Sequence, residues 1–217
     1  MLVAVCLFVV CFLLGSIPWG VVISKAFYHT DIRQHGSGNI GTTNAMRTLG
    51  KKGGAAVFVL DFCKGLLAGA LPLVACWLFV PGGGLTDGSP LSYATYQGIA
   101  FLACVWGHIF SPWLKFKGGK GIAVAVGSLF FTFGPVGALV ELAVFIVVVA
   151  LTRYVSAGSL AAAVACPFVS LWFFWGAWPA WTCCTVAALT VIWAHRSNIA
   201  RLRAGTESRI GQKKKEA

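Results

Sequence analysis

Charged residues are scarce in this chain of 217 residues, since only 11% are Asp, Glu, Lys or Arg and only 6 are acidic. Hydrophobic residues make up 58%, and the mean hydropathy is +0.82. A soluble domain of this length cannot hide so much apolar surface in one core. The scarcity of charge excludes a soluble globular protein, and lipid must be the solvent for most of the chain.

Cysteine pairs and a cleavable leader are also missing. None of the eight cysteines belongs to a Cys-x-x-Cys pair, no histidine cluster lies near them, and almost all fall within apolar runs. We interpret them as small membrane-core residues rather than as disulfides or metal ligands. The N-terminus is apolar from Leu2 and has no basic segment before it, so we expect a first transmembrane helix rather than a signal peptide.

Apolar runs predict an all-α integral membrane protein with a single membrane-embedded domain over residues 1–217. The fourth and fifth runs are shorter than the ~30 Å of hydrocarbon in a bilayer. Gly134-Pro135 separates them, so we expect two short helices; the alternative is one long kinked helix over 122–151. The seven runs cover residues 2–24, 55–80, 92–110, 122–133, 136–151, 157–175 and 178–195.

The distribution of Lys and Arg decides between six and seven spans. With seven spans and the N-terminus outside, all 17 lie at or near the cytoplasmic side, and the outer loops 81–91, 134–135 and 176–177 contain none. With six spans, Arg153 and the basic C-terminal tail would face outward, against the positive-inside rule. We therefore predict seven transmembrane helices, an outside N-terminus and a cytoplasmic C-terminus.

The first of three polar cytoplasmic stretches is residues 35–47, which contains a formal Gly-x-Gly-x-x-Gly. No strand precedes it, so a dinucleotide site is excluded. Glycines let backbone N–H groups approach an anion closely. The candidate side-chain ligands beside them are Ser37, Asn39, Thr43, Asn44 and Arg47. The alternative is a polar loop that happens to be rich in glycine.

The other two stretches each adjoin an expected membrane helix. Gly118, Gly119 and Gly121 surround Lys120 where the fourth helix starts, and a helix N-terminus with an ammonium group favours an anion. The alternative for the neighbouring lysines is an anchor to lipid headgroups. In residues 195–211, helical spacing puts His195 and Asn198 on one face, although a lone histidine could simply cap the helix.

Ionisable residues inside the predicted membrane segments are functional candidates by default. Asp61 and Lys64 are three residues apart and are expected to pair, and His108 ends the third helix near the second polar stretch. Glu141 has no predictable partner. Because the polar groups lie on one side and not at the midplane, an enzyme that joins a soluble phosphate compound to a lipid tail is favoured over a phosphate-ester transporter.

The three stretches together closely resemble the signature motifs of the bacterial acyl-phosphate:glycerol-3-phosphate acyltransferase (PlsY) family. The resemblance extends to Gly15-Ser-Ile-Pro-Trp-Gly20 and Asp61-Phe-Cys-Lys-Gly65, and so runs over nearly the whole chain. One departure is Ser111, which stands where the family usually has proline. The matching motifs are Ser37-Gly-Asn-Ile-Gly-Thr-Thr-Asn44 with Arg47, Gly107-His108-Ile-Phe with Lys117-Gly-Gly-Lys-Gly121, and His195-Arg-Ser-Asn198 with Gly205-Thr-Glu207.

Membership would imply acyl transfer from acyl phosphate to the sn-1 hydroxyl of glycerol 3-phosphate, giving lysophosphatidic acid and phosphate without an acyl-enzyme. It would also imply a multi-pass protein of the bacterial inner membrane with a cytoplasmic site. Acyl phosphate, glycerol 3-phosphate and membrane lipid are then the expected partners. No nucleic acid, metal or other cofactor is expected. The His-x-x-x-x-Asp signature of the other large glycerolipid acyltransferase family is absent.

The resemblance also implies roles for individual residues. Ser37, Arg47, Lys120, His195 and Asn198 would hold glycerol 3-phosphate, and the acyl tail would lie in a groove between helices. The general base stays open between His195 and a phosphate oxygen of the substrate. Residues expected at the acyl-phosphate end are Thr43, Asn44, Gly118, Gly119 and Lys120, and further substrate-binding candidates are Asn39, Arg196 and Glu207.

Overall fold

The structure, a computed structural model, describes residues 1–79 and 92–211, and every regular element within them is helical. The predicted outer loop 81–91 and the end of the basic tail fall outside these ranges. The helices are α1 (Leu2–Ser16), α2 (Trp19–Tyr28), η1 (Ile32–Gln34), α3 (Thr42–Thr48), α4 (Gly50–Phe79), α5 (Tyr93–Ile109), η3 (Pro112–Leu114), α6 (Ile122–Thr132), α7 (Gly134–Thr152), α8 (Val155–Phe173), α9 (Trp178–Ala194) and α10 (Arg196–Arg203).

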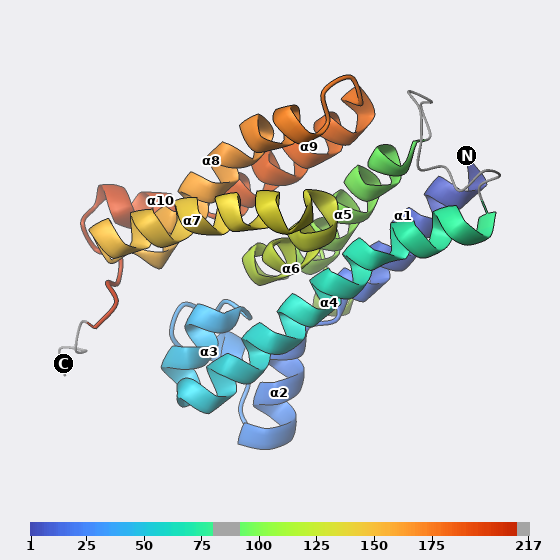
Figure 1. Cartoon of the computed structure of the whole chain (residues 1–217). Helices are drawn as coiled ribbons and strands as arrows, with labels where there is room; N and C mark the ends of the chain where they lie inside the picture. Colours follow the sequence, from blue (N-terminus) through green and yellow to red (C-terminus); the bar gives the residue numbers. More distant parts are fainter. Residues whose placement is uncertain (80–91, 212–217) are drawn as a thin grey trace, which may run out of the picture.

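The first apolar run is two helices and not one, so the prediction of a continuous helix over residues 2–24 was wrong. The break falls at Ile17 and Pro18, because a residue before proline disfavours the helical conformation. The carbonyls left without helical partners are bonded from elsewhere: Ser111 Oγ donates to Ser16 O and Lys64 Nζ donates to Ile17 O, both at 2.7 Å. Beyond the break, α2 turns away from α1 toward α3 (Figure 1).

The predicted separation of the fourth and fifth helices is confirmed, but only one of the two is short. Helix α6 has 11 residues and a length of about 16 Å. Helix α7 has 19 residues and is long enough to cross a membrane. Gly134 and Pro135 begin α7 rather than lying between two shortened helices, because proline is tolerated in a first helical turn.

Four helical segments of the described chain are long and apolar enough to span a bilayer, namely Leu2–Tyr28, Gly50–Phe79, Gly134–Thr152 and Val155–Phe173. The shorter α6 and α9 are also apolar. Figure 1 shows α7, α8 and α9 on one side of the bundle and α1 and α4 on the other. The N-terminus lies at the end opposite α3 and α10, so the polar elements gather at one end (Figure 1).

Glycines set the distance between α1 and α5. A Cβ atom on Gly107 would lie 2.1 Å from the carbonyl oxygen of Phe12, and one on Gly15 would lie 2.2 Å from that of Cys104. Small residues let membrane helices approach closely enough for backbone contact. This approach brings the start of the α5–α6 loop against the α1–α2 break.

We expect Gly107→Ala to lower the thermal midpoint of the purified protein by roughly 2–12 °C, because overpacking costs about 1–3 kcal/mol and each kcal/mol shifts the midpoint by about 2–4 °C at this size. The measurement is thermal unfolding in one detergent. Leu139→Ala, on an exposed face of α7, is the matched control and should stay within about 2 °C. A Gly107→Ala midpoint equal to the control would contradict this account of the α1–α5 contact.

Candidate active site

All three polar stretches meet at one cavity of about 290 Å³ at the polar end of the bundle. Its wall includes residues from the loop before α3, from α3, from the loop before α6, and from α8 and α10. Asp61 of α4 and His108 of α5 close another side. The predicted site residues that line it are Ser37, Asn39, Thr43, Asn44, Arg47, Lys120, His195, Asn198 and Glu207.

Three predicted residues do not line this cavity. The N–H groups of Gly118 and Gly119 donate to the carbonyls of Ile109 and His108 at 2.9 and 3.0 Å, so they are not free to bind a substrate phosphate. These glycines instead allow close packing against the end of α5, where a Cβ atom on Gly118 would lie 2.0 Å from the His108 carbonyl. Arg196 stacks on Trp193 at 4.2 Å, away from the cavity.

The loop before α3 is held in shape by Asn44. Its Oδ1 accepts the Ser37 N–H at 2.9 Å, and its Nδ2 donates to the carbonyls of Ile32, His35 and Asn39. These bonds use both N–H donors of the amide and engage its oxygen, so Asn44 orders the loop. The loop therefore presents side chains. Two of the glycine N–H groups expected to approach an anion bond within the loop instead, Gly38 to His35 O and Gly41 to Asn39 Oδ1.

Three cations face the cavity: Arg47, Lys120 and Arg201. Burial and the charges of Arg201 and Arg47, opposed by the charge of Glu207, lower the pKa of Lys120 to about 8. Such a cluster is a site for an anion with more than one negative oxygen. Arg201 was not among the predicted site residues, although its position three residues after Asn198 was an available signal.

Glu207 ties the C-terminal segment to α8 and α10. One carboxylate oxygen accepts from Asn198 Nδ2 at 2.7 Å and Ser156 Oγ at 2.9 Å, and the other accepts from Arg201 Nε at 2.6 Å. Burial alone would raise the pKa of Glu207, but these hydrogen bonds and the Arg201 charge outweigh burial and lower it. Both oxygens are engaged by protein groups, so Glu207 positions Asn198, whose Oδ1 accepts from Lys120 Nζ.

His195 is 2% exposed and lies between α9 and α10. Its Nδ1 is 2.8 Å from the carbonyl oxygen of Val191, which can only accept, so Nδ1 carries the proton and Nε2 carries the lone pair. Burial, opposed by this hydrogen bond and assisted by the charge of Lys120, lowers the pKa of His195 to about 4. At neutral pH the cavity therefore contains a neutral hydrogen-bond acceptor.

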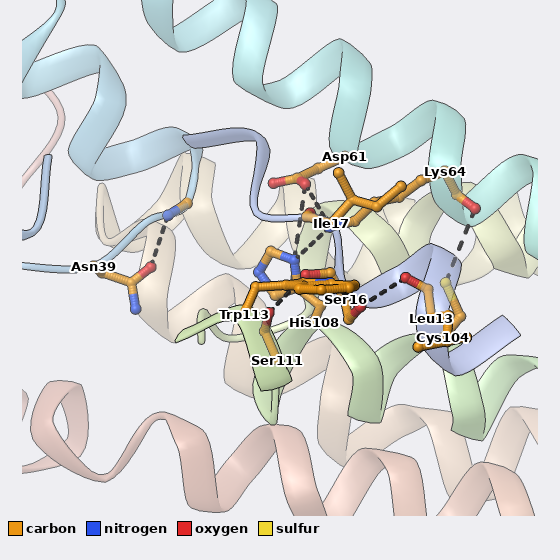
Figure 2. Close-up of polar contacts among 11 residues, drawn as sticks. Leu13, Ser16, Ile17, Asn39, Asp61, Lys64, Cys104, His108, Ser111 and Trp113 are labelled. Carbon is orange, nitrogen blue, oxygen red and sulfur yellow. Dashed lines mark hydrogen bonds and ion pairs between the residues drawn. The ribbon is translucent and has the colours of Figure 1, made fainter. Parts of the chain in front are cut away.

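The predicted pairing of Asp61 with Lys64 is confirmed at 2.8 Å, with both side chains buried. Figure 2 shows that the ammonium group of Lys64 also lies against Ile17 and His108. Ser111 and Trp113 bond to Ser16 just beside them. The serine that replaces the family's usual proline thus fastens the α5–α6 loop to the α1–α2 break.

A second, apolar cavity of about 50 Å³ adjoins the first and lies between α6, α7, α8 and α9. Ile122 and Phe145 line both cavities. Glu141 also lines the apolar one, and its buried Oε1 has no hydrogen-bond partner among residues 1–79 and 92–211. The cationic cavity thus adjoins an apolar one at Ile122 and Phe145, an arrangement suited to a phosphate compound and a lipid chain.

Comparisons with known proteins point to an enzyme of the same kind. A family model described as glycerol-3-phosphate acyltransferase matches residues 5–205. Proteins of that name from Thermosynechococcus vestitus and Trichlorobacter lovleyi are 43% and 44% identical over 202 and 200 residues, covering 92% of this chain and 92% and 93% of theirs. Two crystal structures of PlsY (YgiH), an integral membrane glycerol 3-phosphate acyltransferase, also match. The glycerol 3-phosphate form has a TM-score of 0.78 and 36% sequence identity, and the match covers 96% of both chains. The lysophosphatidic acid form has a TM-score of 0.77 and 35% sequence identity, and the match covers 96% of this chain and 95% of the other.

Fold, cavity and relatives together define an integral membrane acyltransferase. The chain belongs to the glycerol-3-phosphate acyltransferase family, and the resemblance of its motifs to the PlsY proteins is confirmed.

The low pKa of Lys120 leads to a pH dependence of acyltransferase activity. Because the group loses its charge as pH rises through about 8, we expect kcat/KM for glycerol 3-phosphate to fall above that pH. Lys120→Arg keeps its charge at all these pH values, since the arginine pKa exceeds about 12, and its profile should lack this fall. The measurement is kcat/KM between about pH 6 and pH 10, corrected for spontaneous donor hydrolysis. An identical alkaline fall in both proteins would show that another group causes it.

Proposed function

We propose that this protein transfers a fatty acyl group directly from acyl phosphate to the sn-1 hydroxyl of glycerol 3-phosphate, giving lysophosphatidic acid and inorganic phosphate. The observation that carries the proposal is the cavity with Arg47, Lys120 and Arg201 on its wall, with an apolar cavity adjoining it. Two phosphate-bearing substrates need several cations, and the acyl chain needs apolar surface beside them.

In this proposal Ser37, Arg47, Lys120, His195 and Asn198 hold glycerol 3-phosphate. Thr43 lies at the acyl-phosphate end. The assignment is supported by their common position on the cavity wall and by the Lys120–Asn198 hydrogen bond. Asn44 and Glu207 take positioning roles, because their polar atoms already bond to protein groups.

Acyl phosphate is a mixed anhydride with a good leaving group, so direct attack by the hydroxyl oxygen on the carbonyl carbon needs positioning and charge stabilisation more than covalent chemistry. The C–O bond to glycerol forms and the C–O bond to phosphate breaks. His195 Nε2 accepts a hydrogen bond from the attacking hydroxyl and orients it. The departing phosphate, with a pKa near 6, holds the proton more readily than His195 with its pKa of about 4.

The proposed topology has seven spans, with α1 and α2 counted as one, the N-terminus outside and the C-terminus in the cytoplasm of a bacterium. The other spans are α4, α5, α6, α7, α8 and α9. Support comes from the positive-inside rule, because Lys and Arg then lie at the end that carries the cavity. The site would therefore meet soluble glycerol 3-phosphate on the cytoplasmic face of the inner membrane.

Purified protein supplied with palmitoyl phosphate and glycerol 3-phosphate tests this function. We expect phosphate release that requires both compounds, together with one equivalent of lysophosphatidic acid. Acyl-CoA in place of acyl phosphate should give no product. Absence of phosphate release, with uptake of glycerol 3-phosphate into sealed vesicles, would instead identify a transporter.

The two lysines of the second polar stretch should differ in importance. Lys120 lines the cavity and bonds to Asn198, whereas Lys115 is exposed outside it. Lys120→Ala should lower kcat/KM at least about 10-fold, because a charge-assisted hydrogen bond contributes ~1.5–3 kcal/mol. Lys115→Ala should stay within about threefold, since an exposed contact contributes ~1 kcal/mol or less.

Steady-state kinetics on both lysine variants, at equal folded concentration, make the comparison. Equal losses, or a larger loss at Lys115, would mean that the phosphate site lies elsewhere. The prediction rests on the cavity and on the Asn198 contact. It no longer rests on the glycine N–H groups, which bond to the end of α5.

Activity should be independent of divalent metal. Mg²⁺ is usually held by carboxylates together with substrate phosphates. The two carboxylates at this cavity are already engaged, Asp61 by Lys64 and Glu207 by Arg201, Asn198 and Ser156. We expect the initial rate in excess EDTA to equal the rate without it within about twofold, and added Mg²⁺ to make no difference. Loss of activity in EDTA that Mg²⁺ restores would sink this prediction.

A further inference from the structure

His108, a buried histidine to which the proposed function gives no role, carries its proton on a known ring nitrogen. Lys64 Nζ has three N–H donors and no acceptor. It lies 2.7 Å from Ile17 O, 2.8 Å from Asp61 Oδ1 and 3.0 Å from His108 Nδ1. Nδ1 must therefore accept from Lys64. The proton of neutral His108 is on Nε2.

The doubly protonated form of His108 does not fit these contacts. Its Nδ1–H would face the Lys64 ammonium group at 3.0 Å, donor against donor. The nearest carboxylate oxygen, Asp61 Oδ1, is 3.8 Å from Nδ1 and so is beyond hydrogen-bond distance. The Lys64 contact thus fixes His108 as a neutral imidazole with an N–H at Nε2.

This Nε2–H faces the catalytic cavity. His108 lines the cavity, and Figure 2 shows its second ring nitrogen on the side of the ring away from Lys64, toward Asn39. A Cβ atom on Gly119 would lie 2.1 Å from Nε2, so this nitrogen lies directly against the loop that carries Lys120. Within residues 1–79 and 92–211 no acceptor bonds to it. An N–H group on a cavity wall without a protein acceptor is open to a ligand or water.

The two histidines of the cavity are therefore complementary. His195 presents a lone pair at Nε2, and His108 presents an N–H at Nε2. In acyl transfer the attacking hydroxyl needs an acceptor, and the carbonyl oxygen of the donor needs an N–H as it gains negative charge. Sequence motifs alone do not reveal this, because the difference depends on which nitrogen each ring uses for its internal contact.

We propose that His108 Nε2–H is an oxyanion donor that bonds the carbonyl oxygen of the acyl phosphate, with Lys64 as the positioning residue that holds the required tautomer. The inference rests on the proposed function. Negative charge moves onto the carbonyl oxygen when the hydroxyl oxygen bonds to the carbon, and returns when the bond to phosphate breaks. The hydroxyl proton goes to the departing phosphate. His108 keeps its own proton throughout.

Two substitutions separate the two contacts of His108. His108→Asn places an oxygen near the position of Nδ1, where it can still accept from Lys64, and removes the cavity donor. His108→Gln places an N–H near the position of Nε2. We expect His108→Asn to lower kcat by about 10²–10³-fold, the usual effect of losing one oxyanion donor, with KM for glycerol 3-phosphate within about threefold. His108→Gln should keep at least about tenfold more activity than His108→Asn.

His29→Asn is the matched control, because His29 is exposed at the end of α2 with a positive φ that asparagine also tolerates. It should leave kcat unchanged. A kcat for His108→Asn within about threefold of the unsubstituted protein, or equal activity in the Asn and Gln variants, would overturn the proposal. A large increase in KM for the acyl donor with an unchanged kcat would also overturn it, since His108 would then contact the phosphate of the bound donor and not the developing oxyanion. If the unsubstituted protein releases no phosphate, the proposed function fails instead.

A measurement that keeps His108 guards against variants that do not fold. In ¹⁵N-histidine protein carrying His29→Gln and His35→Gln, two exposed sites, only His108 and His195 remain. The ring signals that disappear in His195→Asn belong to His195, and those that remain belong to His108. We expect one Nε2-protonated ring whose N–H resonance moves downfield when palmitoyl phosphate is added without glycerol 3-phosphate. An Nδ1-protonated His108, or an unchanged Nε2–H resonance, would refute the assignment.

Discussion

The ammonium group of Lys64 is the contact on which the polar end of this bundle depends. Its hydrogen bonds reach Ile17, just after α1, and His108 on α5, and its ion pair reaches Asp61 on its own helix. A buried charge without partners costs several kcal/mol, so removing any acceptor leaves a large penalty with the ammonium. Lys64 therefore holds the α1–α2 break open, and that break lets α2 turn toward α3. Beyond α2, Asn44 holds the first polar loop in shape.

The polar backbone groups of the two glycine-rich stretches also bond within the protein. In both, backbone N–H groups that could have met a phosphate bond to the protein instead: Ser37 to Asn44, and Gly118 and Gly119 to the end of α5. The glycines bring chain segments together, and side chains on the resulting wall meet the ligand. A site built in this way is rigid before substrate arrives, which lowers the entropy that binding must overcome.

Sequence reasoning reached the helical fold, the gathering of three polar stretches and the Asp61–Lys64 pair, because apolar periodicity and spacing along one helix are local properties. It did not reach the break at Pro18, the full length of α7, or the contributions of Arg201 and Ser156. The break at Pro18 and the start of α7 at Gly134 follow local rules for proline that the pattern of apolar runs does not include. The contributions of Arg201 and Ser156 depend on the contacts of Glu207 with α10 and α8. The role of the Gly118 and Gly119 N–H groups was misjudged for the same reason, since their acceptors lie on another helix.

The scarcity of acidic residues is finally what gives the cavity its chemistry. Asp61 is used by Lys64, and Glu207 is used by Arg201, Asn198 and Ser156. Arg47 and Lys120 then have no carboxylate partner within the described chain, and repulsion from the neighbouring cations contributes to the low pKa of Lys120. An anion that enters relieves this repulsion, so the charge imbalance that is unfavourable in the empty protein becomes binding free energy for a phosphate. The two carboxylates at the cavity thus hold Lys64 and Arg201 in place, and the positive charge of Arg47 and Lys120 stays available for an anion.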